Sequence, residues 1–257
     1  MLVRSWNLFH GNTWPPQRRA FLDEMIALAT EDDPDVLCAQ EVPGWALGRF
    51  TVGDMASRPP FGVVVGRLLT APHHGLIRSA VSGQGNAFWI SPRLRVLEHH
   101  VLALNPRRFR AREARTFGLD SSARVAWAKE RRIVQVVRLT AGRRTLAVAN
   151  MHCTSYAGDA RLADAEFVRG AWFADSVARR EDVLVLAGDF NARPGSSAAL
   201  TDLCGPEWEF SPAGPGIDHV LVRGAEASPV RVWPEERRRR DDGTLLSDHA
   251  PVEVEIE

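Results

Sequence analysis

The sequence predicts a layered α/β sandwich, in which two β-sheets pack face to face and helices cover the outside. Short apolar runs that suit strands are spread along the whole chain, and two longer segments have helical periodicity. One helix–strand unit also occurs twice, because "DDPDVLCAQE" and "REDVLVLAGDFN" each follow a helical segment and each strand ends in an acid, Glu41 or Asp189. Sheets and helices with one apolar face must bury that face against another layer, and a sandwich does so.

The expected elements follow from these patterns. Strands are predicted at residues 2–8, 36–40, 61–65, 86–90, 133–139, 145–151, 183–188, 219–222 and 252–256. A first amphipathic helix is predicted at 17–30, where one stripe contains Phe21, Leu22, Met25, Ile26 and Ala29. A second is predicted at 160–179, with Leu162, Phe167, Ala171, Phe173 and Val177 at mostly helical spacing, although Trp172 blurs the face.

Composition limits the function classes. The chain has 257 residues and a formal net charge of zero, so no global basic field indicates nucleic acid, although a local basic groove stays open. The three cysteines, Cys38, Cys153 and Cys204, form no CxxC pair, which argues against a disulfide framework and against a zinc site. No signal peptide or membrane span is recognisable, and we expect a cytoplasmic monomer.

Polar residues stand where the apolar runs begin or end. They are Asn7, Glu41, Asn150, His152, Asp189, Asn191, Asp218, His219, Asp248 and His249. The two-residue spacing places Asn150 with His152, and Asp189 with Asn191, on one face of an extended segment. A lone Asp at a strand end is usually a turn or cap residue, and a lone His is usually structural. Ten polar residues at the ends of apolar runs are too many to be explained as turn or cap residues alone, so together they indicate a functional site.

The chemistry of this set is coherent. Its carboxylates and amides supply oxygen ligands without thiolates, which suits Mg²⁺ or Mn²⁺. The histidines His152 and His249 can carry protons near neutral pH. A hard cation with carboxylates and histidines is what metal-assisted hydrolysis of a phosphoester requires.

The motifs "SWNLFHGN", "VLCAQEV", "NMHCTS", "LAGDFNARPGS", "GIDHVLV" and "LSDHAPVEVEI" occur in this order between residues 5 and 256. Together they resemble the endonuclease/exonuclease/phosphatase superfamily, which includes deoxyribonuclease I, abasic-site endonucleases, inositol polyphosphate 5-phosphatases and neutral sphingomyelinases. The resemblance implies an α+β fold, a four-layer α/β/β/α sandwich of two packed, mainly antiparallel mixed sheets. It also implies a single domain over residues 1–257.

The resemblance also implies roles for individual residues. Glu41 matches the principal metal ligand, Asn7 the asparagine beside it, and Asp248 a second carboxylate on the metal side. Asp189 and Asn191 match the pair that orients the attacking water and holds the phosphate. His249 matches the general base or phosphate-binding histidine, Asp218 the carboxylate that fixes its tautomer, and His152 a second histidine. Asn86 resembles an asparagine near the phosphate, and with Asn150 it is expected to bind substrate.

Three further features stay open. Glu130 with Arg131 or Arg132, in "WAKERRIVQVVRL", is expected to be either structural or at the rim of the site. The run Arg237–Arg240 is either a solvated loop or a phosphate contact. Trp14 and Trp45 follow the Asn7 and Glu41 strands, where they either anchor loops or stack on a base or a lipid head group.

Departures from the family patterns narrow the function. "QE" is followed by "VPGW" without the lysine typical of abasic-site endonucleases, and "NARPGSSAA" lacks the inositol 5-phosphatase signature. We therefore expect a Mg²⁺- or Mn²⁺-dependent phosphodiesterase or nuclease that acts on DNA or RNA. The alternatives are a phosphomonoesterase, a lipid or inositol head-group phosphodiesterase, and a non-catalytic binding module on the same fold.

Overall fold

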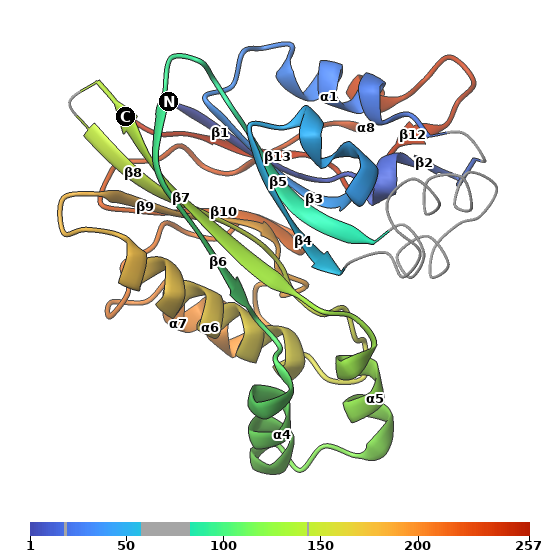
Figure 1. The fold of residues 1–257 in the computed structure, drawn as a ribbon, viewed down its shortest axis with the longest axis vertical. Coiled ribbons are helices and arrows are strands. Elements are labelled where there is room, and N and C mark those ends of the chain that lie inside the picture. Colours follow the sequence, from blue (N-terminus) through green and yellow to red (C-terminus); the bar gives the residue numbers. More distant parts are fainter. Residues whose placement is uncertain (18–19, 58–82, 143) are drawn as a thin grey trace.

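The computed structural model describes residues 1–17, 20–57, 83–142 and 144–257, and within them two sheets pack face to face (Figure 1). The first sheet has the order β11–β13–β1–β3–β5–β4. Its strands are β1 (Leu2–Asn7), β3 (Val36–Pro43), β4 (Val52–Ser57), β5 (Gln84–Ile90), β11 (Arg231–Val232) and β13 (Val252–Glu255). Only β1 and β3 pair in parallel among these described strands, so the sheet is mainly antiparallel.

The second sheet has the order β10–β9–β8–β7–β6. Its strands are β6 (Arg95–Ala103), β7 (Ile133–Ala141), β8 (Arg144–His152), β9 (Val183–Asp189) and β10 (Asp218–Arg223). Here β8 and β9 form the parallel pair, while the other pairs are antiparallel. A small ribbon joins β2 (Thr13–Trp14) to β12 (Leu245–Leu246).

Helices cover the outer faces of both sheets (Figure 1). The helices of the described residues are α1 (Leu22–Thr30), α4 (Arg107–Thr116), α5 (Ser121–Lys129), α6 (Arg161–Val177), α7 (Ala198–Leu203) and α8 (Glu235–Arg238), with the 3₁₀ helices η1 (Phe9–Gly11) and η2 (Gly44–Arg49). Of these, α4 and α5 project beyond the sheets (Figure 1). Leu22 and Met25 of α1 pack on the outer face of the first sheet. Phe167 and Ala171 of α6 pack on the second. The predicted four-layer α+β sandwich is therefore confirmed.

The core between the sheets explains the continuous apolar runs. Val183, Val185 and Ala187 of β9 face the other sheet, while Leu184 and Leu186 face α6. All seven residues of β9 are buried, which is why this strand shows no polar alternation.

Several boundaries differ from the predictions. The first helix begins at Leu22 instead of residue 17, because the Gln17 amide donates to Asn12 Oδ1 and the Phe21 amide to Gly11 O. Strands β2, β4, β6, β11 and β12 and helices α4, α5, α7 and α8 were not predicted. Edge strand β6 has no fully buried residue and an irregular burial pattern. The predicted strand 61–65 lies outside the described residues. No helix in the described part of the chain is long and apolar enough to cross a membrane.

Candidate active site

Strand pairing brings the predicted polar residues to one edge of the sandwich. In the second sheet His152 and Asp218 are both register partners of Asp189. In the first sheet Asn7 pairs with Gln40, directly before Glu41. The two edges meet at a pocket of about 390 Å³, lined by Phe9, Glu41, Ala126, Lys129, Glu130, Arg132, His152, Thr154, Ser155, Asp189, Asn191, Ile217, Asp248 and His249.

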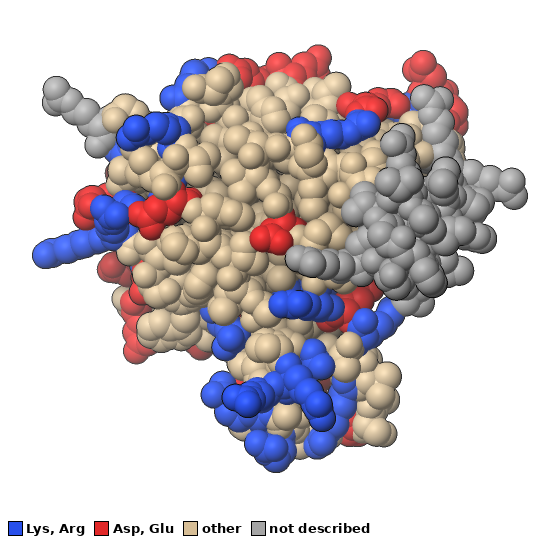
Figure 2. Space-filling model, viewed as in Figure 1, with Lys and Arg blue, Asp and Glu red and all other residues tan. Residues whose placement is uncertain are grey.

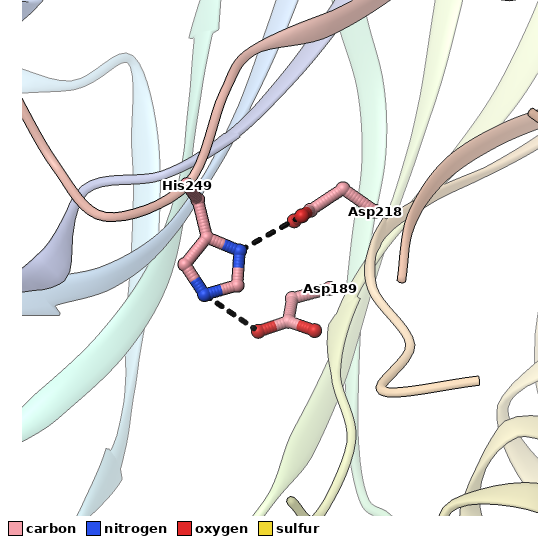
Figure 3. A group of neighbouring side chains, drawn as sticks. All are labelled: Asp189, Asp218 and His249. Atoms are coloured by element: carbon pink, nitrogen blue, oxygen red, sulfur yellow. Dashed lines mark hydrogen bonds and ion pairs between the residues drawn. The ribbon is translucent and has the colours of Figure 1, made fainter. Parts of the chain in front are cut away.

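The centre of the site is an Asp–His–Asp arrangement (Figure 3). His249 Nδ1 donates to Asp218 Oδ2 at 2.8 Å, and its Nε2 lies 3.8 Å from Asp189 Oδ2. The backbone is also fixed, because His249 N donates to Ser247 Oγ and its carbonyl accepts from Trp6 Nε1. Burial lowers the pKa of His249, but the hydrogen bond to Asp218 and the charges of Asp189, Asp218 and Asp248 outweigh it and raise the pKa to about 10. His249 therefore carries a positive charge at neutral pH.

Asp189 is the most deeply placed acid of the pocket, with 2% of its surface exposed. Its Oδ2 accepts a hydrogen bond from Asn7 Nδ2 at 3.0 Å, and its Oδ1 accepts one from the backbone N–H of Asn191 at 3.1 Å. Burial, strengthened by the charge of Asp218, raises its pKa to about 6. A carboxylate with this pKa is ionised at neutral pH and remains a usable base.

Glu41 lies opposite, half-buried, in the irregular part of β3. Its Oε2 lies 3.2 Å from His10 Nε2, and its Oε1 lies 3.4 Å from Asn7 Nδ2. Burial raises its pKa to about 7, and the charges of Asp248 and Asp189 act in the same direction. The charges of Arg132 and His249 partly offset this increase.

His152 and Arg132 form the third side of the pocket. Arg132 Nη1 lies 2.8 Å from His152 Nδ1, and its Nη2 pairs with Glu130 at 2.6 Å. His152 Nε2 lies 3.4 Å from Asp189 Oδ2. Burial and the positive charge of Arg132 nevertheless hold the pKa of His152 well below its ordinary value, so the ring is neutral.

Left-handed backbone conformations gather around the site. Glu41, Asn191 and Ser247 have φ of 51°, 49° and 64°, and Phe9 and His10 follow Asn7 with φ of 46° and 54°. Each such residue costs on the order of 1–3 kcal/mol unless surrounding contacts hold it. Ser247 is held by donating its hydroxyl to Asn7 O at 2.6 Å. Strained backbone residues cluster at active sites and ligand-binding sites, so these conformations support a functional site here.

Two predicted substrate-binding residues lie deeper, between the sheets. Asn150 is fully buried; its Nδ2 donates to Ala39 O and Ala87 O, and its Oδ1 accepts from Gln40 Nε2. Asn86 donates to Ile133 O and Asn150 O. These contacts favour structural roles for both, and substrate contact by Asn86 or Asn150 stays a prediction.

The remaining predicted residues face the pocket in different ways. Asp248 is exposed at its rim. Asn191 donates its Nδ2 to Cys153 O at 3.0 Å, so the amide oxygen is the atom left for a ligand. Asn7 bridges the acids with Nδ2 while its Oδ1 accepts from Phe9 N, so in this conformation it acts as a donor. Metal ligation by Asn7 stays a prediction.

Sequence reasoning missed two residues and left two undecided. His10, beside Glu41, and Ser247, which supports His249, were not singled out. Both stand within quoted motifs, "SWNLFHGN" and "LSDHAPVEVEI", so nearness to a predicted residue was the available signal. Arg132 and Glu130 prove to line the pocket.

The run Arg237–Arg240 is engaged within the protein. Arg237 pairs with Asp32, Arg239 with Glu235, and Arg240 with Glu24. Arg238 is buried and donates to Leu246 O and Ser247 O. This run therefore supports the loop that carries Asp248 and His249.

Comparisons with known proteins agree with this geometry. The model of the Endonuclease/Exonuclease/phosphatase family matches residues 5–249. No curated protein matches the chain. The single domain over 1–257 stays a prediction.

Solved structures share the fold at low identity. A functionally unknown conserved protein from Enterococcus faecalis V583 has 16% identity and a TM-score of 0.66, with 100% of this chain and 99% of that chain covered. Humanized D. rerio TDP2 has 14% identity, a TM-score of 0.61, and coverage of 100% and 98%. The human Nocturnin catalytic domain with bound sulfate anion has 16% identity, a TM-score of 0.58, and coverage of 100% and 94%. With its motifs, fold and pocket in agreement with the family model, the chain belongs to the endonuclease/exonuclease/phosphatase family.

Proposed function

We propose that this chain is a divalent-metal-dependent phosphodiesterase that cleaves DNA or RNA. The family includes nucleases, phosphodiesterases and phosphatases, so the choice among them depends on the pocket. One observation carries the proposal: a charged His249, held by Asp218, shares a pocket with the ionisable acids Asp189 and Glu41 and with Arg132.

The residues present fit a hard cation. Burial and mutual repulsion raise the pKa values of Glu41, Asp189 and Asp248 together. A divalent cation among these oxygens would relieve that repulsion, and an oxygen donor set suits Mg²⁺ or Mn²⁺. Glu41 and Asp248 would hold it, because Asp218 is already hydrogen-bonded to His249. The ion would supply charge neutralisation for the phosphate.

Asp189 and its neighbours handle the water. Its carboxylate is ionised at neutral pH and can accept a proton from the attacking water. The side chain of Asn7 and the backbone N–H of Asn191 donate hydrogen bonds that hold this carboxylate in place. The amide oxygen of Asn191 would orient the water.

Arg132, His152 and His249 handle the phosphate. His249 and Arg132 are positive, and the neutral His152 lies between Arg132 and Asp189. Within the described chain, buried Arg132 Nε has no hydrogen-bond partner. A buried donor without a partner is costly, and an incoming phosphate oxygen would accept a hydrogen bond from the Arg132 guanidinium. The arrangement supports charge stabilisation at a phosphate.

The test is hydrolysis by the purified protein with Mg²⁺ or Mn²⁺ and with EDTA. The substrates are plasmid, single-stranded DNA, RNA, bis-p-nitrophenyl phosphate, p-nitrophenyl phosphate and inositol phosphates. We expect metal-dependent cleavage of diesters that is lost in Asp189→Asn. Activity on monoesters alone would replace the proposal with the phosphomonoesterase alternative, and equal activity in Asp189→Asn would remove the site assignment.

A further inference from the structure

A second feature of the molecule is a basic projection next to the pocket, formed by α4 and α5. We call residues 107–129 the arm. It contains seven Lys or Arg and two Asp or Glu residues, a net charge of +5 in a chain whose net charge is zero. Figure 2 shows these positive side chains gathered over the lobe that α4 and α5 form at the bottom of the view.

The charges of the arm differ from those elsewhere because many of them are not neutralised within the protein. Most other charged clusters consist of ion pairs, such as those of Arg4, Arg93, Arg138, Arg223, Arg231, Arg237, Arg239 and Arg240. Arg107, Arg108 and Arg115 are exposed, and none of the ion pairs found in the described residues includes them. Exposed arginines without an ion pair also occur elsewhere in the described residues, such as Arg95 and Arg180, but three of them lie on the single helix α4.

The arm is also fixed to the active site. Ala126 and Lys129 of α5 line the pocket. Trp127, 1% exposed, donates Nε1 to the buried Glu166, which also accepts from Thr154 N and Oγ1. Thr154 lines the same pocket. Phe109 of α4 packs edge-on against Trp127, at 6.0 Å between ring centroids, so α4 is fixed through α5.

Aromatic side chains lie beside the arginines on the side of α4 that faces α6. A cavity of about 730 Å³ opens there, with Phe109, Phe117 and Trp172 among its lining residues. Arg169 lies over the ring of Phe109 at 4.9 Å, and Arg161 lies over Phe117 at 5.2 Å. Aromatic rings and guanidinium planes are the groups on which nucleobases stack.

We propose that the arm binds the phosphate backbone of a nucleic-acid strand whose scissile diester lies at the pocket, an inference that rests on the proposed function. The ten residues of α4 span about 15 Å. In a duplex, one strand has a phosphate about every 3.4 Å of helix axis, so the length of α4 matches the rise of several phosphates. A membrane surface fits less well, because an interfacial helix needs several large exposed apolar residues. The exposed residues of α4 are Arg, Ala and Thr, and Val125 is the one large apolar residue of the arm that is exposed.

The experiment measures binding of a fluorescein-labelled 20-nucleotide single-stranded DNA by anisotropy, in EDTA so that cleavage does not interfere. Wild type is compared with Arg108→Gln/Arg115→Gln. The matched control is Arg95→Gln/Arg180→Gln, which removes two exposed arginines elsewhere. Each lost phosphate contact on a single strand reduces the slope of log affinity against log salt by about 0.7, so we expect a reduction of about 1.4 in the arm variant.

We expect the arm variant to bind roughly tenfold more weakly at low salt, since both lost contacts are electrostatic. The control variant should match wild type. With Mn²⁺, the ratio of kcat/KM for bis-p-nitrophenyl phosphate to that for the oligonucleotide should rise about tenfold in the arm variant, because only the oligonucleotide can reach α4. Thermal unfolding verifies the fold, and the single variants replace the double variant if it is unstable.

An unchanged slope and affinity in the arm variant would overturn the inference. So would binding of anionic phosphatidylglycerol vesicles, lost in the arm variant, without binding of the oligonucleotide. The two proposals fail separately. If the protein hydrolyses diesters but the arm variant keeps the salt slope of wild type, only the role of the arm is refuted. If the slope changes but no diester is hydrolysed, the proposed reaction is refuted and the arm remains a nucleic-acid-binding surface.

Discussion

The two parallel strand pairs deliver acids to the same pocket in different surroundings. In the first sheet β3 continues past Glu41 through a register shift between Ala39 and Val42, and Glu41 stays half-buried with His10 beside it. In the second sheet β9 ends at Asp189, which is 2% exposed and accepts hydrogen bonds from Asn7 and Asn191. A bulge can re-aim a side chain, and Glu41 lines the pocket from the irregular part of β3. In the proposed function, the acid of the first unit, Glu41, is the metal ligand, and the acid of the second, Asp189, is the general base.

The largest effect is expected at Asp189. Asp189→Asn keeps the shape of the side chain but removes the proton acceptor, so kcat should fall by about 10²–10⁴-fold, the usual contribution of a positioned general base. Steady-state kinetics on a diester measures it, with circular dichroism to verify folding. A decrease in kcat of less than fivefold would contradict the assignment of Asp189 as the general base.

Glu41 is expected to act on metal affinity. Glu41→Gln should weaken Mn²⁺ binding by at least about 10–100-fold, which is the usual cost of losing even an outer contact of a metal site. Calorimetric titration with Mn²⁺ measures this change. Asp189→Asn is the matched comparison, and a larger loss there than in Glu41→Gln would reverse the two assignments.

Asp218→Asn is expected to shift the pH dependence. The raised pKa, about 10, keeps His249 protonated through the neutral range, and Asp218 is the strongest of the groups that raise it. Without that charge the pKa should fall, so the high-pH limb of the activity profile should move down by at least about one pH unit. Asp241→Asn, which removes an exposed acid outside the pocket, is the control and should leave the limb in place.

The smallest effect concerns stabilisation by metal. The pKa values of Glu41, about 7, and of Asp189, about 6, lie above their ordinary values, so both acids are mostly protonated at pH 5.5 and ionised at pH 8. Cation binding requires the ionised form, so Mn²⁺ should raise the unfolding temperature more at pH 8. A tenfold difference in Kd corresponds to about 1.4 kcal/mol of stabilisation at saturating metal. Equal shifts at both pH values would contradict the carboxylate site.

Much of this molecule could be predicted because its signals are local. The alternation and length of apolar runs located most strands of both sheets, and the motif residues Glu41, Asp189, Asp218 and His249 prove to lie around one pocket. Strand β6 and helix α4 could not be predicted in the same way. The edge strand has no fully buried residue and the helix buries only Ala114, so neither shows a clear apolar stripe.

The sequence by itself determined the residue types of the site and the strands that carry them, because periodicity and turn chemistry act over a few residues. Only the tertiary structure decided which groups meet. Asn7 reaches Asp189 across 182 residues, Asn150 is held between the sheets rather than at the pocket, and Arg132 lies against His152. These outcomes depend on the packing of one sheet against the other, because that packing brings groups far apart in the sequence within hydrogen-bond distance. Local pattern does not encode that placement.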